Sequence, residues 1–387
     1  MSARTLVFYV SGHGLGHAAR VIEVINAILA RRDDVRVITR TTAPQWLFDK
    51  TIKPFSPSRQ GPGFSRGVHD QFSRGELETD TGVVQIDSLH LDEAATVARA
   101  HDFMRTFDER VAAEAAFLKQ HHAALVVADT PPLGIAAAKR ARLTAVALGN
   151  FTWDWIYSAY DGADGVTQTI RQAYRLADMA LRLPMNGGFE VFPTIVDLPF
   201  VARRSLREPL DTRRVLGLPE HERLILVSFG GYGLDGLDLE ALGRLPGYGV
   251  LMSGGVPFAE VPRPLQGGRR GSVIPLDERA MYAAGVRYED LVRSVDVVVS
   301  KPGYGIIAEC LANHTALLYT SRGRFIEYDV LVAQMPRFLR AHYLDHDDLF
   351  AGRWLAHLDA LVGQPAPPEQ PAVNGADVAA QLLLDMI

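Results

Sequence analysis

Two histidines, His13 and His17, lie in a glycine-rich stretch near the start of the chain. An imidazole accepts or donates a proton near neutral pH, so histidine is the side chain most often used for acid–base catalysis. The stretch follows the apolar residues 5–10, a predicted buried strand, and precedes residues 18–31, whose apolar spacing predicts a helix. A strand, turn and helix of this kind present backbone N–H groups to an anionic ligand. We therefore expect a ligand site in which a histidine takes part in the chemistry.

This turn does not fit the dinucleotide-binding fingerprint. The pattern G-x-G-x-x-G would require a glycine at position 17, where His17 stands. The next predicted strand, residues 35–39, is followed by Arg40 and offers no acidic residue for a ribose. The turn is therefore expected to bring His17 to a ligand crevice, with Gly14 and Gly16 allowing the ligand to approach the backbone.

A carboxylate is expected beside the same turn. Asp129 ends the apolar run 124–128, so a parallel sheet would place it at the ligand-facing edge. There it can orient an imidazole and stabilise its charge, as the acid of a catalytic triad does. It can also cap the following helix, because Asp-Thr-Pro is a good helix start. Both roles stay open at this point.

Two more glycine-rich turns follow predicted strands in the second half of the chain. Gly230 and Gly231 come after residues 224–229, and their N–H groups could cradle a diphosphate or simply form a tight turn. Residues 300–305 follow the strand predicted at 295–299 and precede the helix predicted at 306–313. Repetition of the pattern favours a ligand-binding role for these turns.

The elements that must position these residues alternate between strand and helix, which is typical of a parallel sheet with helices on both faces. We predict an α/β fold of two Rossmann-like, doubly wound domains facing a cleft, residues 1–198 and 199–387, joined near residues 193–210. A long loop is expected at 55–82, a linker at 364–371 and a closing helix at 374–386. The remaining predicted strands are 145–148, 249–252, 272–274 and 316–319, and the remaining helices 91–120 (whole or broken), 133–141 and 328–341.

Composition fits a globular protein without a polyanionic partner. Of the 387 residues, 48% are apolar and 22% charged, and the net charge of −5 gives no general attraction to nucleic acid or anionic membranes. The single cysteine, Cys310, is expected to be a core residue in a helix. Residues 5–10 are too short for the apolar core of a signal peptide, and no apolar stretch reaches the about 18 residues of a transmembrane helix. A cytoplasmic protein without a transmembrane segment is expected.

Three segments together resemble a known family. They are residues 11–25 (SGHGLGHAARVIEVI), 149–160 (GNFTWDWIYSAY) and 300–312 (SKPGYGIIAECLA), the last followed by 322–332 (RGRFIEYDVLV). They resemble the GT-B glycosyltransferases, and more closely the glycosyltransferase-like half of plant arabinokinases; the third resembles the donor-binding signature of the MurG-like branch. The resemblance covers residues 5–355. The chain has no P-loop or similar kinase loop, so ATP-dependent sugar phosphorylation is not expected.

The resemblance implies transfer of a sugar from a nucleoside diphosphate sugar, with UDP the expected nucleotide, to an acceptor that the sequence leaves open. Inversion is expected, without a metal or other cofactor. His17 matches the position of the catalytic base in related enzymes, so we expect it to act as base or to contact the donor phosphate; a helix cap is the alternative. His13 is expected to line the same site on the acceptor side.

The resemblance also assigns the donor side. Glu309 is expected to hydrogen-bond the ribose hydroxyls, although an acid near a helix start is also favourable with the dipole alone. Ser300, Gly303, Tyr304 and Gly305 would form the turn that lets the donor approach.

A loop after the predicted strand 316–319 would read the donor sugar through Arg324, Glu327 and Tyr328. Related enzymes often have an acid followed by glutamine there, and this chain has Tyr328 in place of the glutamine. The identity of the sugar is therefore not carried over. A plain surface pair between Arg324 and Glu327 is the alternative.

The aromatic segment after residues 145–148 offers an acceptor surface through Asn150, Trp153 and Trp155, although aromatic residues are more often core. The polar run Asp80, Asp87, His90 and Asp92 matches no metal-ligand spacing. Two other functions stay open: a non-catalytic nucleotide or sugar sensor, and a UDP-sugar 2-epimerase of the same fold.

Overall fold

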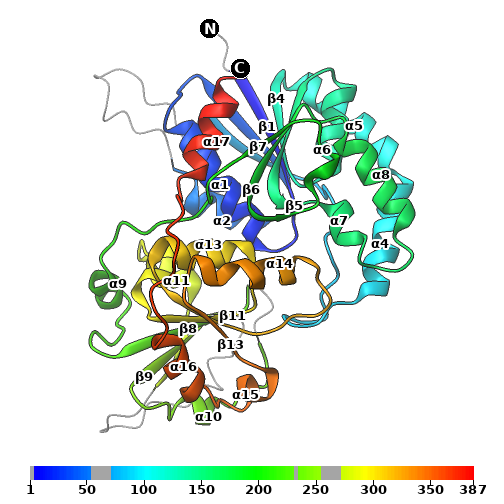
Figure 1. Cartoon of the computed structure of the whole chain (residues 1–387). Helices are drawn as coiled ribbons and strands as arrows, with labels where there is room; N and C mark the ends of the chain where they lie inside the picture. The colour runs from blue at the N-terminus through cyan, green and yellow to red at the C-terminus, as the bar shows by residue number, and fades with distance from the viewer. Residues whose placement is uncertain (1–3, 54–70, 231–233, 254–271) are drawn as a thin grey trace, which may run out of the picture.

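The computed structural model describes residues 4–53, 71–230, 234–253 and 272–387. Its strands form two sheets, of seven and six strands, and every strand pair within them is parallel. The two sheets lie one above the other in Figure 1, each with helices packed on it. The predicted fold class is therefore confirmed.

The first sheet has the strand order β3-β2-β1-β4-β5-β6-β7. Its strands are β1 (Arg4–Val10), β2 (Val35–Thr41), β3 (Phe72–Glu76), β4 (Ala123–Asp129), β5 (Thr144–Phe151), β6 (Met179–Gly187) and β7 (Ile195–Asp197). The helices of this half are α1 (Leu15–Leu29), α2 (Gln45–Thr51), α4 (Glu93–Arg105), α5 (Phe107–Gln120), α6 (Pro132–Arg140), α7 (Trp153–Tyr157), α8 (Asp164–Tyr174) and the 3-10 turn η1 (Phe189–Val191).

The second sheet has the order β10-β9-β8-β11-β12-β13, the doubly wound order of a Rossmann fold. Its strands are β8 (Arg223–Ser228), β9 (Tyr248–Ser253), β10 (Val273–Leu276), β11 (Val297–Ser300), β12 (Ala316–Tyr319) and β13 (Ala341–Tyr343). Its helices are α9 (Pro209–Val215), α10 (Leu239–Leu242), α11 (Glu278–Ala283), α12 (Tyr288–Ser294), α13 (Tyr304–Asn313), α14 (Glu327–Gln334), η3 (Met335–Arg337), α15 (His346–Phe350), α16 (Leu355–Val362) and α17 (Gly375–Leu384).

Strand β1 shows why its sequence is apolar throughout. Leu6 and Phe8 pack into one apolar cluster with α1, while Val7 and Tyr9 pack into another with α6 on the opposite face. A parallel strand covered on both faces needs apolar residues at successive positions rather than at alternate ones. The first of these clusters continues into the second half of the chain and includes Cys310, which is fully buried as predicted.

Helix α17 packs against α1, so the C-terminal end of the chain returns to the first sheet (red beside blue in Figure 1). Arg31 pairs with Asp377 at 2.7 Å, and the Gly375 N–H donates to the Phe200 carbonyl at 2.9 Å.

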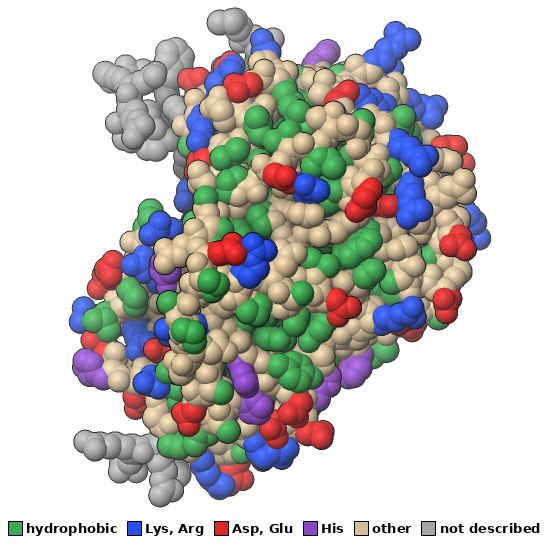
Figure 2. Space-filling view, in the orientation of Figure 1, with side chains coloured by type: hydrophobic (Ala, Val, Ile, Leu, Met, Phe, Trp, Pro, Cys, Tyr) green, Lys and Arg blue, Asp and Glu red, His purple; other side chains and the backbone are tan. Residues whose placement is uncertain are grey.

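On the face in Figure 2, acidic and basic side chains of both halves are interspersed. Among the described residues, no helix combines the length and apolar character needed to cross a bilayer.

Two local predictions were wrong. The helix expected at 328–341 ends at Gln334; Pro336, which lacks a backbone N–H, lies in η3, and Ala341 begins strand β13. The loop expected at 55–82 contains β3, whose sequence FSRGE has no apolar alternation. That strand forms because β2 offers it an open edge for pairing.

Gly134 in α6 provides a test of this packing. A Cβ there would lie 2.6 Å from Cγ of Tyr9, whose hydroxyl donates to Glu114 at 2.9 Å and fixes the ring. We expect Gly134→Ala to lower the free energy of unfolding in urea by about 1–3 kcal/mol through overpacking. Gly165→Ala in α8 is the control, because its nearest neighbour would be 4.0 Å away. The control should raise stability by about 0.5–1 kcal/mol; equal effects of the two changes would contradict the prediction.

Candidate active site

Several of the predicted ligand residues lie at the points where strand order reverses in each sheet. In the first sheet, β1 and β4 are neighbours, and the turn with His13 follows β1 while Asp129 is the last residue of β4. In the second sheet, β8 and β11 are neighbours, and Gly230 and Ser300 lie at their carboxyl ends. Doubly wound sheets bind ligands at such positions, because the following loops diverge there.

His17 and Asp129 are brought together. Gly14 is the N-cap of α1 with φ of 72°, a conformation that favours glycine, and places His17 in the first turn of the helix. The imidazole is buried, and its Nδ1 lies 3.3 Å from Oδ1 of Asp129, which is fully buried. Asp129 does not cap the next helix, since α6 has Pro131 as its N-cap without a side-chain bond. The geometry thus favours the orienting role over the capping role.

Arg20 completes this cluster, and the sequence analysis missed it. Its guanidinium donates to Oδ1 of Asp129 from Nη2 at 2.5 Å and to Oδ2 from Nε at 3.3 Å. The same Nη2 lies 3.0 Å from Nδ1 of His17. Burial alone would raise the pKa of Asp129, but the positive charge of Arg20 holds it below its usual value. The only available signal was the i, i+3 spacing of His17 and Arg20 on one helix face.

The cluster reaches the second half of the chain through Asn150. Arg20 Nη1 donates to Oδ1 of Asn150 at 2.8 Å, and Nδ2 of Asn150 donates to Oε1 of Glu327 at 2.7 Å. Glu327 is buried in the first turn of α14, which packs against β6. The alternative of a surface pair with Arg324 is therefore wrong: Arg324 is 60% exposed and pairs with Glu93 at 3.5 Å.

Tyr328 follows Glu327 but lies beside other tyrosines. Burial, together with Tyr319 and Tyr343, raises its pKa to about 12. The structure shows no hydrogen bond from Tyr328 to the His17 cluster among the residues it describes. A role of Tyr328 in reading the donor stays a prediction.

Trp153 and His13 line the other side of His17. Trp153 is fully buried, and its Nε1 donates to Oδ2 of Asp80 at 2.9 Å, while Ser11 Oγ donates to Oδ1 of Asp80 at 3.0 Å. The half-buried His13 meets the Trp153 ring edge-on at 5.8 Å. Burial raises the pKa of Asp80 to about 6. Asp80 thus belongs to this site as a hydrogen-bond acceptor, which its place in a polar run did not indicate.

Trp155 lies apart from these residues. Its ring packs against Gly187 and Gly188 at the end of β6, where a Cβ on Gly187 would come within 2.5 Å of it. An acceptor contact for Trp155 therefore stays a prediction that the packing does not favour.

Hydrogen bonds and helix contacts stabilise the turn after β11. Ser300 Oγ donates to the Ser228 carbonyl at 2.6 Å, and Gly303 is the N-cap of α13. Tyr304 accepts from the Val201 N–H at 3.1 Å, and its ring lies 5.4 Å from the Arg20 guanidinium. Helices α1 and α13 meet here, and a Cβ on Gly305 would lie 3.7 Å from Cα of Gly16. Gly230 has a φ of 78°, and Gly231 lies outside the described residues.

Glu309 is buried and already has a cationic partner. Arg203 donates to Oε1 of Glu309 from Nε at 2.6 Å and also from Nη2. Arg203 lies 3.9 Å from Glu289 as well. Burial raises the pKa of Glu309, and the charge of Arg203 opposes part of that rise. The sequence could not show this pair, because its members are 106 residues apart.

Two half-buried cations, Lys301 and Arg322, face the same region. Among the described residues, neither Lys301 nor Arg322 lies within ion-pair distance of a carboxylate. Lys301 donates to the Ser88 carbonyl at 2.7 Å, and Arg322 stacks on Phe325 at 4.1 Å. Burial and the charge of Arg322 lower the pKa of Lys301 to about 7. Burial, with the charges of Arg322 and Lys301, lowers the pKa of His13 to about 3. This electrostatic environment suits an anion.

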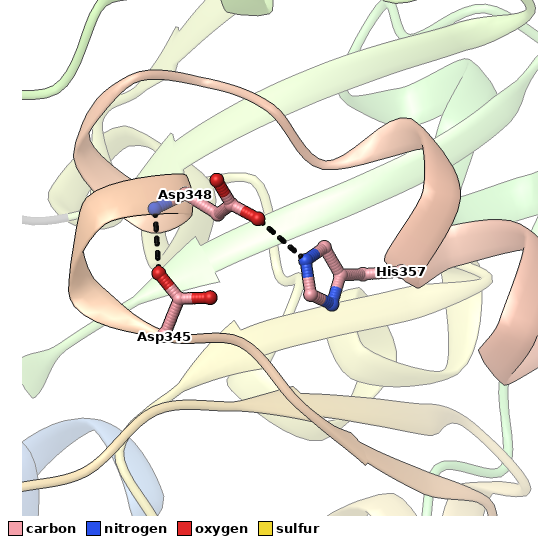
Figure 3. A group of neighbouring side chains, drawn as sticks. All are labelled: Asp345, Asp348 and His357. Atoms are coloured by element: carbon pink, nitrogen blue, oxygen red, sulfur yellow. Dashed lines mark hydrogen bonds and ion pairs between the residues drawn. The ribbon is translucent and has the colours of Figure 1, made fainter.

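Among the residues that the structure describes, one group could by composition hold a metal ion: the ligand atoms of Asp345, Asp348 and His357 lie within 4.8 Å of one another (Figure 3). Each has a structural partner. Asp345 accepts from the Asp348 N–H at 2.9 Å and caps α15, and Asp348 accepts from His357 at 2.9 Å and from Arg353 at 2.6 Å. Capping and ion pairing therefore account for the cluster.

The polar run at residues 80–92 is also explained by local bonds. Asp87 bonds His90 at 2.8 Å, and Asp92 caps α4 by accepting from the Ala95 N–H at 2.8 Å. Asp80 faces Ser11 and Trp153 instead. Each of these three aspartates therefore has its own hydrogen-bond partner.

Comparison with known proteins bears on the fold. No protein-family model matches the chain. The chain is 28% identical over 390 residues to the L-arabinokinase of Arabidopsis thaliana, covering 99% of this chain and 34% of that protein, and so spans about a third of its length. The resemblance predicted from the motifs is confirmed by this likeness.

Solved structures add the class of fold. UGT2 of Phytolacca americana, complexed with UDP-2fluoro-glucose and pterostilbene, aligns with a TM-score of 0.57 and 14% identity, over 100% of this chain and 94% of that one. MurG of Acinetobacter baumannii aligns with a TM-score of 0.52 and 14% identity, over 99% of both chains. The chain therefore has the GT-B fold.

Proposed function

We propose that the protein is a glycosyltransferase that moves a sugar from a nucleoside diphosphate sugar, with UDP the expected nucleotide, to an acceptor hydroxyl. The observation that carries this proposal is the buried cluster of His17, Asp129 and Arg20 at the switch point of the first sheet, bonded through Asn150 to Glu327 of the second half. His17, which can act as an acid or base, and Glu327, which can bind a sugar, thus belong to one hydrogen-bond network on a GT-B fold. Inversion and independence of a metal belong to the proposal.

In the proposed reaction, the acceptor oxygen bonds to the anomeric carbon of the sugar as the bond to the diphosphate oxygen breaks. His17 takes the acceptor proton, and Asp129 stabilises the resulting imidazolium. The electron pair of the broken bond leaves on the diphosphate. One displacement at the anomeric carbon inverts its configuration.

The departing diphosphate needs positive charge near it. Lys301 and Arg322 lack carboxylate partners among the described residues and are two cations of the second half that are available to it. The N–H group of Gly230 can add a hydrogen bond. These groups supply the charge stabilisation that a divalent metal would otherwise give, which supports the proposal of a metal-independent reaction.

Glu309 and Glu327 are proposed to bind donor hydroxyls, of the ribose and of the sugar respectively. Glu309 would share its carboxylate between the ribose and Arg203, and Glu327 between the sugar and Asn150. The acceptor would enter beside His13. Trp153, being fully buried, would support His13 rather than contact the acceptor directly.

A thermal-shift screen tests the binding half of this proposal. The purified protein is melted with UDP, GDP, ADP, dTDP and their common sugar conjugates. A ligand that binds only the folded state raises the melting temperature by mass action, and we expect UDP and a UDP-sugar to do so. No shift with any diphosphate would contradict the proposal. Binding without release of UDP across an acceptor panel would favour the sensor, and conversion of the UDP-sugar to its 2-epimer would favour the epimerase.

Lys301→Met is expected to weaken binding of a UDP-sugar about 10-fold to 100-fold, the usual range for losing a hydrogen bond to a charged group. In the native protein, affinity should fall as pH rises through about 7, because the Lys301 ammonium loses its proton there. The diphosphate of a UDP-sugar has no oxygen that titrates in this range, so this slope should vanish in Lys301→Met. Calorimetry at several pH values measures both effects. Lys119→Met, at an exposed lysine, is the control; identical pH slopes in all three proteins would contradict the prediction.

A further inference from the structure

The bonds around Arg20 fix the protons of the His17 cluster. A guanidinium keeps its charge at any physiological pH and can only donate. Its Nη2 carries two hydrogens, and two acceptors lie within reach: Oδ1 of Asp129 at 2.5 Å and Nδ1 of His17 at 3.0 Å. One hydrogen for each acceptor satisfies Nη2 without leaving either of its hydrogens unused.

The position of Nδ1 in the imidazole plane holds either a hydrogen or a lone pair, never both. If Nδ1 accepts from Arg20, the proton of the neutral ring must be on Nε2. The competing bond, from a protonated Nδ1 of His17 to Asp129, would span 3.3 Å, longer than the 3.0 Å between Nδ1 and Nη2 of Arg20. Its acceptor, Oδ1, also already takes the shorter bond from Arg20. The distances and the number of available hydrogens therefore both favour the tautomer with its proton on Nε2.

We propose that Arg20 selects the tautomer of His17 and holds the neutral imidazole with its proton on Nε2. This is the reverse of a catalytic triad, in which the carboxylate accepts from Nδ1 and leaves Nε2 free as the base. In the unliganded protein, Nε2 of His17 is therefore a hydrogen-bond donor. It becomes a base only when the bond from Arg20 to Nδ1 gives way to a bond from Nδ1 to Asp129.

Arg20 has a second connection through which this exchange can be driven. Its Nη1 donates to Asn150, which is held in turn by Glu327 of α14. Glu327 is the residue proposed to bind the donor sugar, so donor binding competes for the carboxylate that anchors Asn150. Tyr304 of α13 lies 5.4 Å from the guanidinium on the side of the second sheet. Arg20 thus lies between the donor half of the molecule and the histidine, as a positioning residue.

Nitrogen NMR of the unliganded protein tests the tautomer directly. The protein is labelled with 15N-histidine, and the signals of His17 are assigned among the 12 histidines by comparison with His17→Gln. Spectra are recorded at a pH well above the titration of an ordinary imidazole. We expect Nδ1 to have the chemical shift of a bare ring nitrogen and Nε2 that of a protonated one. A bare Nε2, or a ring still doubly protonated, would overturn the proposal without any variant being made.

Two substitutions separate tautomer control from general support of the fold. Arg20→Leu removes the N–H groups that donate to Asp129 and to His17. Arg20→Lys keeps the charge but replaces the planar guanidinium by a single nitrogen, which cannot donate to Asp129 and His17 in the same geometry. Both are expected to move the proton of His17 to Nδ1, completely in the first and in part in the second. Arg32→Leu, whose guanidinium pairs with Asp34 at 2.6 Å, is the control and should leave the tautomer unchanged. An unchanged tautomer in whichever Arg20 variants fold would overturn the proposal.

The tautomer is measured without any substrate, so its outcome is independent of the transfer reaction; only the role of the exchange in catalysis rests on the proposed function. Titration of the labelled protein with the UDP-sugar found in the thermal screen tests that role. The expected result is a shift of His17 toward a bare Nε2 as the donor binds, and loss of this response in Glu327→Gln. A tautomer that stays Nε2–H in the saturated native protein would contradict the link to the donor while leaving the assignment for the unliganded protein intact.

Discussion

His17→Ala is expected to lower the turnover number of sugar transfer by about 10²–10⁴-fold, the usual contribution of general acid–base catalysis. Without the imidazole, the acceptor hydroxyl must lose its proton to water while it attacks the anomeric carbon. Asp129 is not expected to replace it as base, because Arg20 binds both of its oxygens and holds its pKa below the usual value.

Binding of the donor should survive this change, because the groups proposed to bind the nucleotide belong to the second half. The measurement is release of the nucleoside diphosphate with a saturating donor and acceptor, together with calorimetry of the donor alone. His221→Ala, at an exposed position after α9, is the matched control and should leave both quantities unchanged. Turnover unaffected by His17→Ala would exclude the base role, and loss of donor binding would instead favour contact with the donor phosphate.

Arg203→Met is expected to lower the free energy of unfolding by about 3–5 kcal/mol, the usual cost of removing one member of a buried ion pair. The guanidinium lies between Glu309 and Glu289, both buried, and its loss leaves Glu309 without its cation, whereas Glu289 keeps Arg287 at 2.9 Å. Most of the cost arises from the uncompensated charge rather than from the lost contact area. Urea unfolding of the two proteins measures the difference.

A double-variant cycle separates pairing from packing. Adding Glu309→Gln to Arg203→Met removes the stranded charge, so the double variant should be more stable than the sum of the two single effects predicts, by about 0.5–3 kcal/mol. Arg182→Met is the control, because the pair of Arg182 with Asp197 is exposed and should be worth about 1 kcal/mol or less. If Arg203→Met cost no more than Arg182→Met, Arg203 would not be the counter-ion of Glu309. In that case, Glu309 would be better described as a carboxylate that is freely available to a ribose.

The strands and the turns that follow them could be predicted from sequence because they depend on local patterns. Residues 5–10 are continuously apolar since both faces of β1 are covered, and the glycine turn after them requires the positive φ found at Gly14. The weaker strands could not be predicted this way. Strand β3 lacks an apolar pattern, and β13 follows a proline-containing turn, so pairing with a neighbouring strand decides both.

The sequence by itself determined the fold class, the placing of His17 in a turn beside a sheet edge, and the expectation that Asp129 would meet it. These follow from strand-to-helix order and from the rule that parallel strands bring their carboxyl ends together. Only the tertiary structure decided the partners of the charged residues: Arg20 with Asp129, Arg203 with Glu309, and Glu327 with Asn150. The physical reason is that a buried charge must find a counter-ion or hydrogen bond wherever the packed chain brings one within about 3 Å. That encounter depends on how the elements pack, across separations of more than a hundred residues that no local pattern records.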